Sequence, residues 1–106
     1  MSFKTYKPIQ GVFIDTNSTG NQSVVSIDST YYKLQDTVVL TSNRTYTLAT
    51  TGSKDLAEAT LSFIDLDFGA YSITIQDESG LMPVINFNSS GTFFFKLINN
   101  RWYRFI

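Results

Sequence analysis

The sequence predicts an all-β fold, a single antiparallel β-sandwich or jelly-roll-like barrel of about nine short strands. Apolar residues recur with a period of two along most of the chain, as in strands that bury one face. Clusters of Gly, Asn, Asp and Ser interrupt these runs roughly every ten residues, as turns between short strands do. The length of 106 residues fits one domain. Because no internal repeat of fixed length is evident, we do not expect a solenoid or a propeller.

The first half of the chain supplies several strand candidates after a polar arm. We expect residues 1–10, MSFKTYKPIQ, to form an N-terminal arm in front of a β-sandwich domain that spans residues 11–106. The arm contains no apolar run, so it is not expected to be a signal peptide. The segments with strand character are residues 11–16, 22–28, 29–34, 37–40 and 44–49.

The second half alternates more regularly. Residues 53–59 can form one helical turn, which is too short to be stable alone. Strand candidates follow at residues 60–68, 70–76 and 83–87, and the last begins with a proline, which suits a strand start.

The closing segment, GTFFFKLINNRWYRFI, predicts a hairpin around Asn99 and Asn100. Asparagine tolerates the positive φ that a type I′ turn needs at both central positions. This loop places Leu97 opposite Trp102. One face of the hairpin then carries Phe93, Phe95, Leu97, Trp102, Arg104 and Ile106, and the other carries Phe94, Lys96, Ile98, Arg101, Tyr103 and Phe105.

The second of these faces is too apolar for the wet side of an antiparallel sheet. Full burial of one Phe is worth ~1.5–3 kcal/mol, and an exposed cluster of them promotes aggregation. Either the helical turn or a long loop covers this face within the subunit, or a symmetry-related copy covers it. We favour the copy, because the two arginines suit a subunit boundary. The predicted oligomer interface comprises Phe94, Ile98, Arg101, Tyr103, Arg104 and Phe105.

The composition argues against several classes of function. The chain has no His and no Cys, which removes the usual metal ligands, the neutral-pH base and thiolate chemistry. We therefore expect no enzyme, no catalytic residues, no bound metal and no cofactor. A net charge of −1 favours neither nucleic acid nor an anionic membrane, and no apolar run is long enough for a membrane span. Only 16% of the residues are charged and 15% are aromatic, a balance that suits a chain with shared interfaces.

Two smaller features leave alternatives open. Asp65 and Asp67 share one face of a predicted strand, and with Asp77 and Glu78 they suggest a Ca²⁺ site, although a solvated strand end explains them better. A glycosidase carboxylate pair is a weaker alternative, because the chain offers little room for a cleft. The pair at Tyr31 and Tyr32 can stack on a sugar or a base, but packing of one ring in the core is the simpler expectation.

The closing two-thirds of the chain resembles the terminal segments of bacteriophage tail fibres, head fibres and small virion β-proteins. YSITIQDESG followed by INFNSSGTFFFKLINNRWYRFI matches their order of strand, Asp-x-x-Gly turn, Ile-rich strand, Gly-x-x-x-Phe strand, Asn-x-Trp and terminal Ile. VVLTSNRTYTLA is similar to a strand–turn–Tyr–strand found upstream in such domains. The matching residues are Tyr71, Ile73, Ile75, Asp77, Gly80, Ile85, Gly91, Phe93, Phe95, Asn100, Trp102 and Ile106.

This resemblance implies a non-enzymatic virion structural protein that assembles as a homotrimer. The chain shows no collagen-like, coiled-coil or β-helical shaft, so we expect a capsid decoration or auxiliary protein that contacts the major capsid protein, with the arm docked on its neighbour. The alternatives are a receptor-binding fibre or spike tip that meets a host-surface glycan, and a carbohydrate-binding module.

Overall fold

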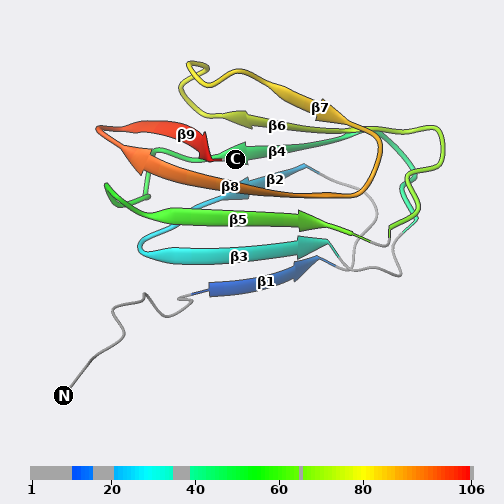
Figure 1. The fold of residues 1–106 in the computed structure, drawn as a ribbon, viewed down its shortest axis with the longest axis horizontal. Helices are drawn as coiled ribbons and strands as arrows, with labels where there is room; N and C mark the ends of the chain where they lie inside the picture. Colours follow the sequence, from blue (N-terminus) through cyan, green and yellow to red (C-terminus); the bar gives the residue numbers. More distant parts are fainter. Residues whose placement is uncertain (1–10, 16–20, 35–38, 65, 106) are drawn as a thin grey trace.

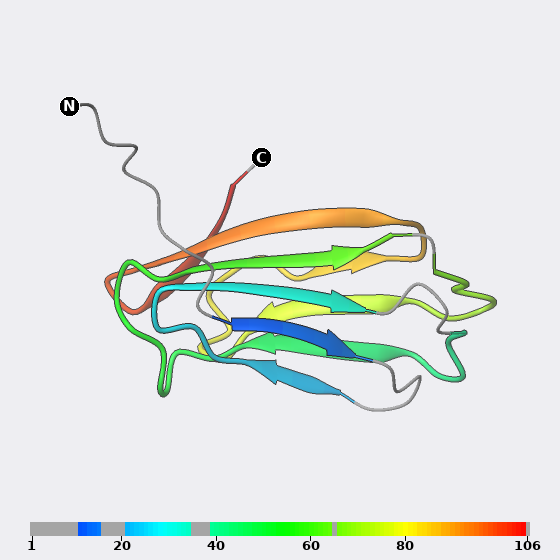
Figure 2. The ribbon, with the colours of Figure 1, turned by 90° about the horizontal axis from the view of Figure 1, so that it is seen from below.

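Two β-sheets pack face to face and form the whole of the described fold (Figure 1, Figure 2). The computed structural model describes residues 11–15, 21–34, 39–64 and 66–105. One sheet has five strands in the order β1-β3-β5-β8-β9, and the other has four in the order β2-β4-β6-β7. This confirms an all-β fold of two layers. Within the described ranges, no helix is long and apolar enough to cross a membrane.

The strands are short, as the spacing of turn residues predicts. Their bounds are β1 Gly11–Asp15, β2 Gln22–Val24, β3 Ser29–Leu34, β4 Arg44–Leu48, β5 Glu58–Phe63, β6 Ile73–Asp77, β7 Ile85–Phe87, β8 Gly91–Ile98 and β9 Arg101–Phe105. Of the predicted strand at residues 37–40, the described part makes only an isolated bridge, between Val39 and Asp67. The expected arm at residues 1–10 lies outside the described residues.

The two packed sheets fit the predicted β-sandwich, but the predicted antiparallel arrangement is wrong, because both sheets are mixed. The chain crosses to the other sheet after each of the strands β1 to β5, so the next strand in the same sheet runs in the same direction. β1, β3 and β5 are therefore parallel neighbours, as are β2, β4 and β6. The antiparallel pairs are those made by the last three strands: β7 with β6, β8 with β5, and β9 with β8.

Strands β1 to β6 thus form a short parallel coil, in which the chain alternates between the two sheets. The sequence analysis did not predict such a coil, because it found no fixed repeat. Gly11 pairs with Thr30, and Thr30 pairs with Ala59, so successive coils contain 19 and 29 residues. In the other sheet Gln22 pairs with Tyr46, a coil of 24 residues. These unequal lengths explain why the sequence shows no fixed repeat.

The predicted helical turn at residues 53–59 is also absent from the structure. Leu56 has a φ of 69°, which a right-handed helix excludes. The segment bonds to β8 instead: Leu56 N–H donates to the Leu97 carbonyl (2.7 Å), and Leu97 N–H donates to the Ala57 carbonyl (2.9 Å). The residues of the helical turn that could have covered the outer face of the closing hairpin therefore lie beside β8, in the plane of the sheet.

The core lies between the two sheets and is rich in aromatic rings. Phe63 contacts Tyr46 and Phe87 at ring-centroid distances of 5.0 and 5.3 Å. Trp102 is 1% exposed, and its indole N–H donates to the Ala49 carbonyl at 3.1 Å. The last strand is therefore bonded across the core to the chain that follows β4.

Candidate interaction surface

The closing hairpin has the predicted loop and register. Asn99 and Asn100 have φ values of 50° and 65°, as a type I′ turn requires. Leu97 pairs with Trp102, and both side chains are buried in the core. The predicted pairing of Phe93 with Ile106 involves a residue outside the described ranges. Because the register fixes which side chains share a face, the outer face of the hairpin is the one predicted from the sequence.

This outer face is exposed. Phe94, Tyr103 and Phe105 are 49%, 41% and 46% exposed, and Ile98 is half-buried. β9 lies at the edge of the five-stranded sheet rather than at its centre (Figure 1). The prediction that a helical turn or loop covers this face within the subunit is therefore wrong for the described chain, because its rings remain in contact with solvent.

The apolar surface extends from the hairpin across the sheet. Tyr31 pairs with Thr60, Thr60 with Phe94, and Phe94 with Phe105, so these four residues form one row over four strands. In the neighbouring row, Lys96 Nζ lies 3.6 Å from a carboxylate oxygen of Glu58. We call this surface, from Tyr31 to Phe105, the aromatic face.

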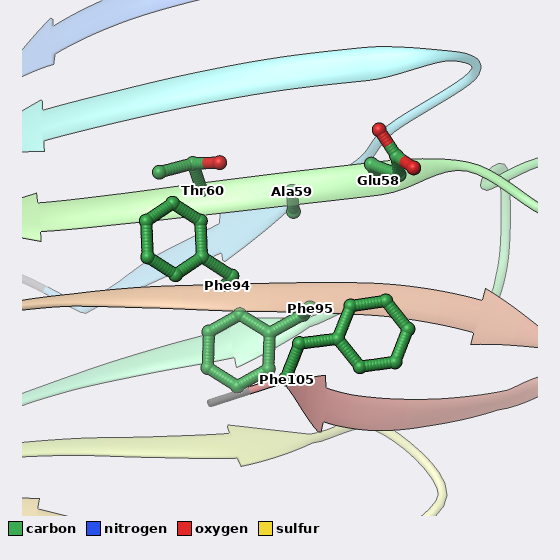
Figure 3. A pocket seen from close by; sticks show the side chains of 6 residues that line it. All are labelled: Glu58, Ala59, Thr60, Phe94, Phe95 and Phe105. Carbon is green, nitrogen blue, oxygen red and sulfur yellow. The ribbon is translucent and has the colours of Figure 1, made fainter.

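A shallow hollow lies within the aromatic face. It has a volume of about 320 Å³ and is lined by Glu58, Ala59, Thr60, Phe94, Phe95 and Phe105. Figure 3 shows the ring of Phe94 reaching toward Thr60 and the ring of Phe105 lying over β8, with the Glu58 carboxylate at the far end. The hollow therefore combines two aromatic rings with one carboxylate at its rim.

The outer face of the four-stranded sheet has the opposite character. Its side chains are all uncharged and polar: Ser23, Thr45, Thr47, Thr74, Gln76 and Asn86. Gln76 donates from Nε2 to the Thr47 hydroxyl at 3.3 Å. Water can hydrogen-bond to the polar groups of this face. Exposed aromatic rings are therefore found on the outer face of the five-stranded sheet and not on that of the four-stranded sheet.

The two arginines of the predicted interface lie on different sides of β9. Arg101 is on the aromatic face, with its guanidinium carbon 5.3 Å from the centre of the Tyr103 ring, and it donates to the Leu81 carbonyl at 3.4 Å. Arg104 alternates to the core side, where its guanidinium carbon lies 5.1 Å from the centre of the Phe93 ring. The structure thus places five of the six predicted residues on one face and Arg104 behind it.

A second surface, which sequence reasoning missed, lies beside the aromatic face. A groove of about 580 Å³ runs between the edge strands β7 and β9, lined by residues 82–86 and 101–104. We call it the edge groove. Val84, one of its lining residues, is 62% exposed, and Leu81, which precedes the lining residues in the chain, is 58% exposed. The signal in the sequence is the apolar run LMPV directly after the turn at Gly80.

The carboxylates considered for a Ca²⁺ site serve separate local roles. Asp67 accepts a bond from the Gly69 N–H (3.0 Å), and Asp77 is buried and accepts bonds from Met82 N–H (3.1 Å) and the Ser79 hydroxyl. Glu78 binds the loop that follows β4. Asp65 lies outside the described residues, and among the described ones no three potential metal-binding side chains cluster.

The tyrosine pair divides between the two faces. Tyr32 packs in the core, 5.2 Å from Tyr46 in an edge-on arrangement, whereas Tyr31 is half-buried on the aromatic face. The expectation that one ring of the pair packs in the core is therefore confirmed.

No family model, curated protein or solved structure matches this chain.

Proposed function

We propose that this protein is a non-enzymatic structural subunit that assembles as a homotrimer through its aromatic face. The contrast between the two outer faces is the observation that carries this proposal. One sheet presents hydroxyl and amide groups to water, and the other presents half-exposed rings at Phe94, Tyr103 and Phe105. Covering these three rings removes roughly 300 Å² from water, on the order of 7 kcal/mol at ~25 cal/mol per Å². That gain lies within the range of the cost of association, ~4–15 kcal/mol, so further contacts must complete the interface.

The setting that we propose is a virion, with the trimer acting as a capsid decoration or auxiliary protein that contacts the major capsid protein. The resemblance of residues 38–106 to the terminal segments of phage structural proteins supports it. The lack of His and Cys in the sequence supports a non-enzymatic role, because most nucleophile–base pairs require one of them.

Light scattering coupled to size exclusion tests the assembly. The wild-type chain is expected to have the mass of a trimer at micromolar concentration. Replacing Phe94 and Tyr103 together with Ser should give the mass of a monomer with an unchanged circular dichroism spectrum, because both rings point away from the core. Tyr71→Ser is the matched control, since Tyr71 is also exposed but lies outside the aromatic face, and it should remain trimeric.

Two results would contradict the trimer. One is a monomeric wild-type protein that also makes no self-contact in an assembled particle. The other is a Phe94→Ser/Tyr103→Ser variant that stays trimeric and folded, because the aromatic face would then not be the interface.

A second candidate function, glycan binding at a receptor-binding tip or in a carbohydrate-binding module, is favoured by the hollow itself. Its two rings can stack on a sugar, and Glu58 and Thr60 can bond to hydroxyl groups at its rim. A wild-type monomer that binds neutral oligosaccharides in calorimetry, with binding lost in Phe94→Ser, would favour this function over assembly.

A further inference from the structure

We propose that the trimer closes by a head-to-tail contact in which residues 81–84 of one copy insert into the hollow of the aromatic face of the next. This inference rests on the proposed function and specifies its interface. It assigns a role to the exposed loop between β6 and β7, and it places β9 closest to the rotation axis.

Symmetry requires two different surfaces on each copy. A patch that pairs with itself gives a twofold dimer, whereas a ring of three is made of heterologous contacts between unlike patches. The aromatic face supplies one patch. The other must lie elsewhere on the same chain, and it must be apolar and shaped to fill the hollow.

Residues 81–84 lie elsewhere on the chain and are all apolar. Val84 is the most exposed large apolar side chain among the described residues, and Leu81 is nearly as exposed. The loop is held from within: Met82 is buried, and its N–H donates to the buried carboxylate of Asp77 at 3.1 Å. A loop fixed in this way loses little conformational entropy when it binds, so its apolar side chains contribute most of their burial to affinity.

The charges of the two surfaces are complementary. Among the described residues that line the hollow, Glu58 is the only charged one. Its carboxylate lies 3.6 Å from Lys96 Nζ of the same chain, but it is partly exposed and can accept bonds from more than one cation. The described residues that line the edge groove include Arg101 and Arg104 and no acidic residue. Arg101 is held beside the loop by its bond to the Leu81 carbonyl, so seating the loop in the hollow brings a cation of one copy toward the carboxylate of the next.

The position of the two surfaces is compatible with a closed ring. The aromatic face is the outer side of the five-stranded sheet, and the edge groove is the open side of the sandwich between β7 and β9 (Figure 1). They are adjacent walls that meet along β9, and Tyr103 belongs to both. A subunit with two contact walls that meet at one strand forms a wedge, and wedges close into a ring around that strand.

Engineered disulfides test the contact, because the sequence contains no Cys and the introduced thiols are the only ones. A Thr60→Cys/Val84→Cys double variant places one thiol at the hollow and one on the loop. Under mild oxidation it is expected to form a covalent trimer on a non-reducing gel, since a disulfide forms only where two Cβ atoms lie within ~3.5–4.5 Å. A Thr45→Cys/Val84→Cys variant, with its first thiol on the polar outer face, should stay unlinked.

Single variants define the type of contact. Thr60→Cys alone and Val84→Cys alone should remain unlinked, and an equimolar mixture of the two should link only into dimers. Covalent dimers from either single variant would overturn the inference, because they show a self-paired interface. A wild-type trimer whose double variant is folded but unlinked would overturn the inference and leave the proposed function standing, whereas a wild-type monomer would defeat the proposed function.

Discussion

Glu78 shows how one exposed side chain joins two turns. Its carboxylate accepts bonds from the backbone N–H groups of Thr50 and Thr51, at 2.9 Å each, and from both of their hydroxyls. The N–H and hydroxyl of Thr51, followed by those of Thr50, favour the ionised form and hold the pKa of Glu78 below its ordinary value of 4.5. The turn after β6 is thereby bonded to the turn after β4.

The lowered pKa of Glu78 predicts a pH-dependent contribution to stability. A group whose pKa falls on folding stabilises the protein above its unfolded pKa, and this contribution is lost as the pH drops through the folded pKa. Glu78→Gln should therefore lower the melting temperature at pH 7, with the difference from wild type shrinking below pH 4.5. Thermal unfolding by circular dichroism at pH 7 and pH 3 measures it, and an equal difference at both values would contradict the argument.

Among the elements, the closing hairpin is the one that sequence reasoning predicts best. Its loop, register and buried Trp102 follow from local information: two residues that tolerate positive φ, flanked by alternating side chains. The direction of the other strands could not be predicted in this way. Parallel and antiparallel strands both show a period of two when one face is buried, and what decides between them is whether each turn crosses to the other sheet.

The hairpin turn should tolerate Gly but not a β-branched residue. Asn100 has a φ of 65°, where a β-branched side chain clashes with the backbone. Asn100→Val should lower the free energy of unfolding by about 1–2 kcal/mol, while Asn100→Gly, the matched control, should change it little. Urea unfolding followed by Trp102 fluorescence measures both, and equal effects of the two substitutions would argue against the type I′ turn.

At the scale of the whole molecule, the sequence predicts a two-layer β fold and one of its two candidate interaction surfaces. The aromatic face is predictable because its exposed rings lie on the hairpin, within residues 94–105. The edge groove is not, because its walls come from residues 82–86 and 101–104, which meet only through the packing of the two sheets. The parallel coil cannot be predicted for a different reason: its coils differ in length, so they leave no repeat in the sequence.

The last strand contributes a buried side chain to the core, so its removal should unfold the molecule and not merely shorten the sheet by one strand. Deleting residues 102–106 removes Trp102, whose ring is buried between the sheets and whose indole N–H bonds to the Ala49 carbonyl at 3.1 Å. Truncation of a buried Trp costs ~3–5 kcal/mol, a large share of the ~5–15 kcal/mol that stabilises a domain. It also exposes the edge of β8, and an uncovered strand edge promotes aggregation.

The deleted chain is therefore expected in the insoluble fraction on expression. The control is Phe105→Ser in the full chain, which changes an exposed ring of the same strand and leaves Trp102 in place; it should remain soluble and folded by circular dichroism. A soluble deleted chain with a cooperative thermal transition would contradict the argument, because the two sheets would then hold together without the indole that bridges them.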